Sequence, residues 1–118
     1  MDSPPARLID PRILEVMTRV KQNLNLRLSC EHLAREVNLS PSRLRHLFKS
    51  EIGMTPSQYA KTLRINKAKE LAVSTFLNVK EIIAKLGNFD QSHFLRDFKR
   101  GNGETLTQYR RRRSQIGH

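Results

Sequence analysis

The sequence repeats itself after 50 residues, and this repeat limits the possible folds more than any other feature. From Ser29/Val79 to Tyr59/Tyr109, ten of 31 residue pairs are identical without a gap. Chance would give about two identities, so one structural unit used twice is the better explanation. The identical pairs are Glu31/Glu81, Ala34/Ala84, Asn38/Asn88, Ser42/Ser92, Phe48/Phe98, Lys49/Lys99, Gly53/Gly103, Thr55/Thr105, Gln58/Gln108 and Tyr59/Tyr109.

The first copy is predicted to form a helix, a tight turn and a second helix. Ser29 and Ser40 are candidate N-caps, because a serine hydroxyl can accept from an otherwise unpaired N–H of the first turn. Pro41 suits the first helical position, where its missing N–H costs nothing, and Gly53 suits a left-handed C-terminal cap. The apolar residues at helical spacing are Leu33, Ala34, Val37, Leu44, Leu47 and Phe48.

The second copy follows the same pattern. Asn78 and Glu81 have the spacing of a capping box, and Gly87 with Asn88 is predicted to form the turn. Asp90 is then the N-cap of the second helix, which ends near the two glycines at 101 and 103. The expected core residues are Ile82, Ile83, Leu86, Phe89, Phe94 and Phe98.

A small residue recurs in the first helix of each copy, at Ala34 and Ala84. Two helices joined by a short turn approach each other closely, and a large side chain at the crossing would clash. Alanine is also simply a good helix former, but its recurrence in register favours the interpretation as a crossing residue.

Three further helices are predicted around the two copies. The first runs from Pro11 to about Asn23, with apolar residues at helical spacing. A capping box of Thr55 and Gln58 begins a long helix that ends near Ser74. Its roughly 19 residues span about 28 Å at 1.5 Å per residue. Thr105 and Gln108 begin a short last helix that contains the arginine run 110–113.

The predicted fold is therefore all-α, a seven-helix bipartite domain with two helix-turn-helix subdomains joined by one long helix. Residues 1–10 form a flexible N-terminal segment and residues 11–54 the first subdomain. Residues 55–74 form the linker helix, residues 75–113 the second subdomain and residues 114–118 a C-terminal tail.

The charge balance indicates the class of partner. Lys and Arg number 22 against 11 Asp and Glu, a net charge of +11 that favours a polyanion such as nucleic acid. No apolar stretch approaches the roughly 20 residues that span a bilayer, so no membrane partner is expected. The single Cys30 fits the reducing cytoplasm. Metal-ligand spacing, phosphate loops and nucleophile elbows are missing, which predicts a protein that is not an enzyme and needs no cofactor.

The outward residues of the two second helices, about 41–51 and 91–100, are rich in hydrogen-bond donors. Arg can bond bidentately to guanine and Gln to adenine in the major groove, whereas Lys suits phosphate. Any solvated helix face can carry such residues, so the assignment depends on the helix-turn-helix context. The residues predicted to read bases are Ser42, Arg45, His46, Gln91, Ser92 and Arg96. Those predicted to contact the DNA backbone are Ser40, Arg43, Lys49, Lys99, Arg110 and Arg111.

The length of the linker helix matches the geometry of DNA. Successive major-groove faces on one side of B-DNA lie about 34 Å apart. A helix of about 28 Å plus its turns could hold two recognition helices at about that separation. We therefore expect the chain to bind double-stranded DNA as a monomer.

Both units together resemble the DNA-binding domain of the AraC/XylS family of bacterial transcription regulators, over about residues 8 to 113. The first unit matches at Leu33-Ala34, Leu39-Ser40-Pro41-Ser42, Leu44, Leu47-Phe48-Lys49 and Gly53-Met54-Thr55-Pro56. The long helix matches at Leu63-Arg64, Ala68 and Leu71. The second unit matches at Ile83-Ala84, Gly87, Asp90-Gln91-Ser92, Phe94, Arg96, Phe98-Lys99, Gly103, Thr105 and Tyr109-Arg110.

The resemblance implies a sequence-specific transcription regulator whose two recognition helices enter the major groove. An activator is expected, and the choice between activation and repression stays open. RNA polymerase is then a candidate partner. Leu106 stands where the family usually has proline. Two readings of the second turn stay open: either the turn at Gly87 is one residue shorter than usual, or Ile82-Ile83 take the family's Ile-Ala positions and Phe89 is displaced. Whether the second unit reads bases or only binds the backbone therefore stays open.

Two alternatives also remain at this point. A non-specific basic nucleic-acid-binding protein would explain the charge, although not the repeated capped helices. The chain is otherwise the DNA-binding fragment of a larger, effector-regulated regulator, because most family members carry a further ligand-binding or dimerisation domain.

Overall fold

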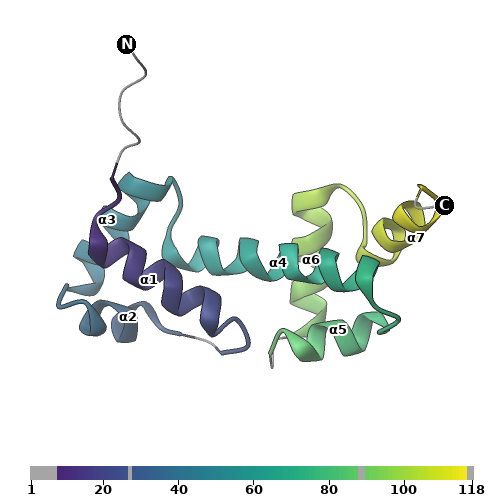
Figure 1. The fold of residues 1–118 in the computed structure, drawn as a ribbon, viewed down its shortest axis with the longest axis horizontal. Coiled ribbons are helices and arrows are strands. Elements are labelled where there is room, and N and C mark those ends of the chain that lie inside the picture. The colour runs from purple at the N-terminus through teal and green to yellow at the C-terminus, as the bar shows by residue number, and fades with distance from the viewer. Residues whose placement is uncertain (1–7, 27, 88–89, 117–118) are drawn as a thin grey trace, which may run out of the picture. The chain divides into compact units, whose positions relative to one another are not determined.

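The described part of the chain consists of α-helices and the turns between them. The computed structural model describes residues 8–26, 28–87 and 90–116, which contain seven helices and no strand (Figure 1). The helices are α1 (Pro11–Gln22), α2 (Cys30–Glu36), α3 (Pro41–Ile52), α4 (Pro56–Ser74), α5 (Val79–Lys85), α6 (Gln91–Asn102) and α7 (Leu106–Ile116). The predicted all-α fold of seven helices is confirmed.

The helices divide into two compact units. The first unit comprises Met1–Asn23 and Leu28–Ala60, and the second comprises Leu24–Arg27 and Lys61–His118. The division falls inside α4, so the long helix contributes to both units instead of forming a separate segment.

The chain ends differ from the predicted boundaries. Residues 1–7 of the predicted flexible segment lie outside the described residues, whereas Asp10 caps α1 and accepts from the N–H of Arg12. At the other end, residues 114–116 were expected in a tail but continue α7.

The core of the first unit is made by the inner faces of α1, α2, α3 and the start of α4. Its buried side chains are Ile13, Val16, Val20, Leu33, Ala34, Val37, Leu44, Phe48 and Tyr59. The rings of Phe48 and Tyr59 pack edge to face with their centroids 5.5 Å apart, a geometry that aromatic pairs favour. Burial of Leu44 and Phe48 fixes which side of α3 faces inward, and the opposite side faces solvent.

The core of the second unit is built in the same way around α6. Its buried side chains are Ala68, Ala72, Ile82, Ile83, Leu86, Phe94, Phe98 and Leu106. The ring of Phe98 lies 6.4 Å from Phe94 and 6.3 Å from Tyr109, measured between centroids. Leu106 is 1% exposed, so its side chain fills the core. Phe89, also predicted for this core, lies outside the described residues.

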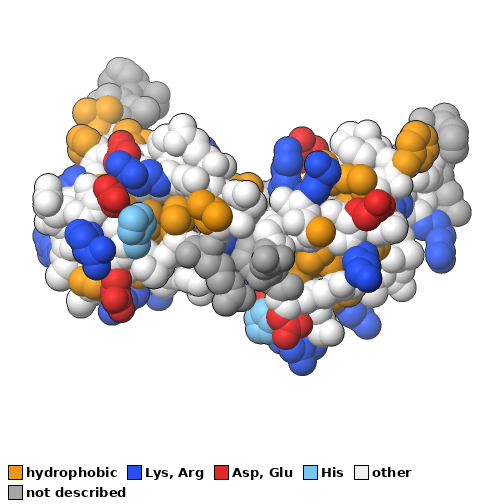
Figure 2. Space-filling view, turned by 90° about the horizontal axis from the view of Figure 1, so that it is seen from below, with side chains coloured by type: hydrophobic (Ala, Val, Ile, Leu, Met, Phe, Trp, Pro, Cys, Tyr) orange, Lys and Arg blue, Asp and Glu red, His pale blue; other side chains and the backbone are white. Residues whose placement is uncertain are grey.

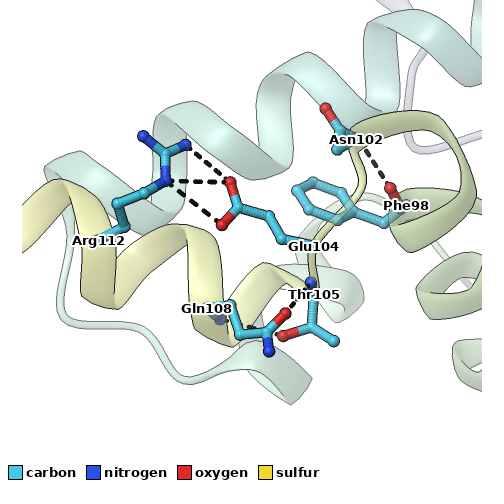
Figure 3. A network of polar contacts seen from close by, with 6 residues as sticks. All are labelled: Phe98, Asn102, Glu104, Thr105, Gln108 and Arg112. Carbon is cyan, nitrogen blue, oxygen red and sulfur yellow. Dashed lines mark hydrogen bonds and ion pairs between the residues drawn. The ribbon is translucent and has the colours of Figure 1, made fainter.

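The predicted helix starts are confirmed at each cap. The side chains of Ser29, Ser40, Asn78 and Asp90 accept from the backbone N–H groups of His32, Arg43, Glu81 and His93. Thr55 with Gln58 and Thr105 with Gln108 form reciprocal capping boxes, of which the second is drawn in Figure 3. These bonds satisfy N–H groups that a helix start leaves unpaired.

Helices α3 and α6 both end on a glycine. Gly53 after α3 and Gly103 after α6 adopt left-handed conformations, with φ of 89° and 76°. Each donates its N–H four residues back, Gly53 to Lys49 and Gly103 to Lys99. Glycine is the residue that adopts this conformation without steric cost, so the ends of α3 and α6 are set by the sequence.

The two units differ by one residue in their turns. The N-caps of α2 and α5, Ser29 and Asn78, are 49 residues apart, whereas Ser40 and Asp90, which cap α3 and α6, are 50 apart. The second unit therefore has one more residue between its two helices than the first.

This offset corrects the interpretation of the paired alanines. Ala34 is fully buried, but Ala84 is exposed, so Ala84 is not the residue at the helix crossing. Ile83 takes the position equivalent to Ala34, because α5 begins one residue earlier than the repeat requires. The ungapped repeat therefore holds for α3 and α6 but not for α2 and α5.

Candidate nucleic-acid interface

The predicted DNA-binding residues of α3 lie on its solvent-facing side. Helical geometry at 3.6 residues per turn places them opposite the two buried core residues, Leu44 and Phe48. The exposed residues among them are Ser40, Ser42, Arg43, Arg45, His46 and Lys49. The structure thus brings the predicted residues from Ser42 to Lys49 to one helix face, whereas Ser40 caps the start of α3. None of these side chains is buried.

The residues of α3 are spread across this face in a defined order. His46 lies nearest its middle, with Ser42 and Lys49 to one side and Arg43 to the other. Arg45 lies at the edge next to α2, where its Nη1 donates to the Sγ of Cys30 at 3.9 Å. The Sγ of Cys30 is in turn 3.7 Å from the carbonyl oxygen of Pro41. The Arg45 contact is long and leaves most of the five N–H donors of its guanidinium unused.

The predicted residues of α6 are arranged in the same way. Arg96 lies near the middle of the exposed face, the position that His46 takes in α3. Ser92 and Lys99 lie to one side, as Ser42 and Lys49 do in α3. Gln91, Ser92, Arg96 and Lys99 are all exposed, whereas Phe94 and Phe98 point into the core.

Asp97 on α6 was not predicted as a site residue from the sequence. Among the described residues, it is the one charged residue that is buried. Its side chain is 8% exposed, although it lies on α6. Its Oδ2 is 3.3 Å from Lys61 Nζ and 3.3 Å from His93 Nε2, and its Oδ1 is 3.5 Å from Arg100 Nη1. A sequence signal for it existed, because the repeat aligns Asp97 with the apolar Leu47.

The arginines of α7 differ in their surroundings. Arg110, predicted to contact phosphate, points its guanidinium at the end of α4 instead. Its Nε donates to the carbonyl of Ala72 at 2.9 Å and its Nη2 to that of Thr75 at 3.5 Å. Arg111, predicted for the same role, is exposed.

The next arginine forms an ion pair within the second unit. Arg112 makes a fork-like contact with the carboxylate of Glu104, shortest at 2.7 Å between Nη2 and Oε2 (Figure 3). Its hydrogen bond lowers the pKa of Glu104 below the ordinary value, although partial burial opposes this. The centroid of the Tyr109 ring lies 5.5 Å from Lys69 Nζ and 5.6 Å from the Arg112 guanidinium carbon, within the range of cation–π contacts.

One face of the molecule carries basic side chains mixed with other types. Figure 2 shows one face on which Lys and Arg side chains alternate with acidic, histidine and hydrophobic side chains in both units. Among the described residues, no group of His, Cys, Asp and Glu could hold a metal ion. None of the described helices is long and apolar enough to cross a membrane.

Comparison with known families places most of the chain in one of them. A family model described as a helix-turn-helix domain matches residues 33–112. The arabinose operon regulatory protein of Escherichia coli is 30% identical over 103 residues, which cover 86% of this chain and 35% of that protein. The transcriptional activator RhaR of an Enterobacter species is 31% identical over 111 residues, covering 94% of this chain and 39% of that protein.

Solved structures are similar over nearly the whole chain. The C-terminal domain of AraT, a response regulator from Geobacillus stearothermophilus, has a TM-score of 0.83 and 29% identity, covering 89% of this chain and 88% of that chain. A regulator with an AraC-type DNA-binding domain from Chromobacterium violaceum has a TM-score of 0.80 and 28% identity, covering 89% and 94%. The DNA-binding domain of AdpA, solved in complex with a target DNA, shares the fold, with a TM-score of 0.79, 24% identity and coverage of 86% and 91%.

Proposed function

Because this chain belongs to the AraC/XylS family of helix-turn-helix transcription regulators, we propose that it binds double-stranded DNA sequence-specifically through α3 and α6. Each of these helices enters the major groove, and the two occupy adjacent segments of it. The chain spans 35% and 39% of the length of the two relatives described above. It corresponds to the DNA-binding part of such larger regulators.

The observation that carries this proposal is the common arrangement of α3 and α6. In both helices a serine or aspartate cap and a glycine end fix the length, and two aromatic or aliphatic core residues fix the rotation. The remaining face is solvent-exposed and carries hydrogen-bond donors at matching positions, Ser42 and Ser92 among them. A packaging protein that binds through charge alone has no need for two such matched faces.

The side chains on these faces suit two kinds of DNA contact. We assign base reading to residues near the middle of the exposed faces, His46 and Arg96, and near the leading ends of the helices, Ser42, Gln91 and Ser92. Arg45 joins them from the edge next to α2, because its long contact to Cys30 leaves most of its donors available. Arginine bonds bidentately to guanine O6 and N7, and glutamine to adenine N6 and N7. We assign backbone contacts to Ser40, Arg43, Lys49, Lys99 and Arg111, because phosphate contacts need charge or a hydroxyl and no fixed geometry. The occupied guanidinium of Arg110 argues against the same role for it.

The proposal extends to the state of the protein on DNA. Two recognition helices in one chain allow a monomer to occupy a bipartite site, so we propose that it binds as a monomer in the cytoplasm. One of the relatives is named as a transcriptional activator, and this supports RNA polymerase as a further partner.

Two substitutions in α3 test the assignment of base and backbone contacts. Arg45→Ala should cost roughly 1–3 kcal/mol on a preferred duplex and relax the preference at one base pair. Lys49→Ala should weaken binding to all duplexes alike and lower the salt slope of log K by about one. Ser50→Ala, an exposed position outside the proposed contacts, serves as the matched control and should leave binding unchanged.

The readout is fluorescence anisotropy on a preferred duplex and on its single-base variants, at fixed salt. If Arg45→Ala and Lys49→Ala both act uniformly on all duplexes, the base-reading assignment is wrong. If the wild-type protein binds all duplexes equally, the protein is a non-specific nucleic-acid-binding protein instead.

A further inference from the structure

A cluster of four charged or titratable side chains lies where α4 and α6 meet in the second unit. The Asp97 carboxylate is its centre, with Lys61 Nζ and His93 Nε2 each at 3.3 Å and Arg100 Nη1 at 3.5 Å. A buried carboxylate is costly unless it is paired, and here its two oxygens are shared among three partners. The acid therefore gathers the three side chains at one place.

The cations of this cluster remain available to a ligand. The side chains of Lys61 and Arg100 are 50% and 78% exposed, whereas that of Asp97 is 8% exposed. Lysine has three N–H donors and arginine five, and one carboxylate at these distances leaves most of them unused. His93 bonds the same carboxylate through Nε2 and completes its set of partners.

The position of the cluster on α6 fits the edge of a DNA groove. Around the exposed face of α6, Arg96 is central, Lys99 lies on one side, and Arg100 lies on the other beside His93. A helix in the major groove, which is about 12 Å wide, has bases in front of it and a phosphate backbone along each flank. A shallow depression beside Arg100 is lined by Arg96, Lys99 and Gly103 as well, so its lining side chains are all basic.

The repeat shows that the acid is not required by the fold of the unit. The α3 residue equivalent to Asp97 is Leu47, which is partly buried, while the flanking core residues Leu44 and Phe48 match Phe94 and Phe98. An apolar residue at this position therefore suffices to pack a recognition helix in the first unit. The charged residue in the second unit needs a different explanation.

We propose that Lys61 and Arg100 form a phosphate-binding site for the DNA strand along this flank of α6, and that Asp97 is the positioning residue that holds them. The inference rests on the proposed function, since it assumes that α6 lies in the major groove. It adds a contact from the long helix α4 to the backbone contacts of the second unit. The ligand is the phosphodiester backbone, so the site adds affinity without sequence preference.

Two exposed substitutions test the contact directly. Lys61→Gln and Arg100→Gln should each reduce the salt slope of log K by about 0.9, the value for one phosphate contact. Through counterion release alone, this corresponds to roughly fivefold weaker binding at about 0.15 M salt. Lys67→Gln is the matched control, because Lys67 is exposed on the same helix and pairs with Glu70 at 3.2 Å. It should leave the slope unchanged.

The sign of the effect of Asp97→Asn tests the positioning role. This substitution raises the net charge by one, so an acid that merely repels DNA would give tighter binding when it is removed. If the acid positions Lys61 and Arg100, Asp97→Asn should weaken binding to every duplex. The loss of affinity should be smaller in a protein that already carries Lys61→Gln. Circular dichroism of Asp97→Asn shows whether the helices of the variant are kept. If they are lost, the salt slopes of Lys61→Gln and Arg100→Gln still decide whether the phosphate-binding site exists.

The outcomes separate this inference from the proposed function. Unchanged slopes for Lys61→Gln and Arg100→Gln, with a wild-type protein that still prefers its selected duplex, would overturn the phosphate site alone. Tighter binding by a folded Asp97→Asn variant would overturn the positioning role. A wild-type protein with no preferred duplex would overturn the proposed function itself.

Discussion

Arg110 and Arg111 are adjacent in sequence, yet the structure predicts opposite consequences when each is replaced. The guanidinium of Arg110 donates to the carbonyls of Ala72 and Thr75 at the end of α4. The side chain of Arg111 is exposed. We therefore expect Arg110→Met to lower stability and Arg111→Met to lower DNA affinity.

The magnitude follows from the two hydrogen bonds. A hydrogen bond from a charged donor contributes about 1.5–3 kcal/mol, and the bond to Ala72 at 2.9 Å counts in full. The bond to Thr75 at 3.5 Å is at the limit of hydrogen bonding and adds little. Methionine keeps the apolar stem, so a loss of about 2 kcal/mol is expected. For a chain of 118 residues that unfolds as one, this lowers the Tm by about 8 °C.

Thermal unfolding followed by circular dichroism measures the first effect, and the salt dependence of DNA binding measures the second. Arg111→Met should leave the Tm within about 1 °C and reduce the salt slope by about 0.9. The reverse pattern, a stable Arg110→Met variant with a reduced salt slope, would refute the structural role of Arg110 and restore the phosphate contact expected from the sequence.

Two further predictions concern the second unit. Gly101→Ala should raise the free energy of unfolding by up to about 0.5–1 kcal/mol, because Gly101 is helical in the last turn of α6, alanine loses less backbone entropy there, and nothing lies within 4 Å of the added Cβ. Gly103→Ala has equal space but a φ of 76°, so it should lower that free energy by about 1–2 kcal/mol; denaturant titrations in which both variants shift stability in the same direction would contradict this. The hydrogen bond from Arg112 lowers the pKa of Glu104 in the folded protein. The ionised carboxylate therefore stabilises the fold fully above its ordinary pKa of 4.5, and this stabilisation is lost as the pH falls through the lower pKa of the folded state. Stability measured between about pH 3 and 6 should therefore fall less steeply for Glu104→Gln than for the wild type, and parallel curves would count against the ion pair.

Local signals in the sequence were sufficient to predict most of the fold. The cap residues, the prolines at 41 and 56 and the glycines at 53 and 103 act within one helical turn, so their effect is readable without tertiary contacts. The periodic apolar residues of α3 and α6 likewise predicted which faces are buried, and hence which donors are exposed.

The errors came from features that depend on distant parts of the chain. The ungapped repeat paired Ala34 with Ala84, although an extra residue in the second turn shifts α5 by one position and exposes Ala84. Sequence spacing could not show that the end of α4 receives the guanidinium of Arg110 from α7. It also could not show that Lys61 of α4 meets Asp97 of α6, because those residues are 36 positions apart.

The central claim is that this chain recognises one DNA sequence with two helices. The most direct test is selection of bound duplexes from a random pool with the purified protein, at about 150 mM salt, where purely electrostatic binding is weakened. The account predicts two enriched half-motifs about one helical turn apart, about 10 base pairs from centre to centre. A single half-motif would restrict base reading to one unit, and a pool with no enrichment would contradict sequence-specific binding by this chain.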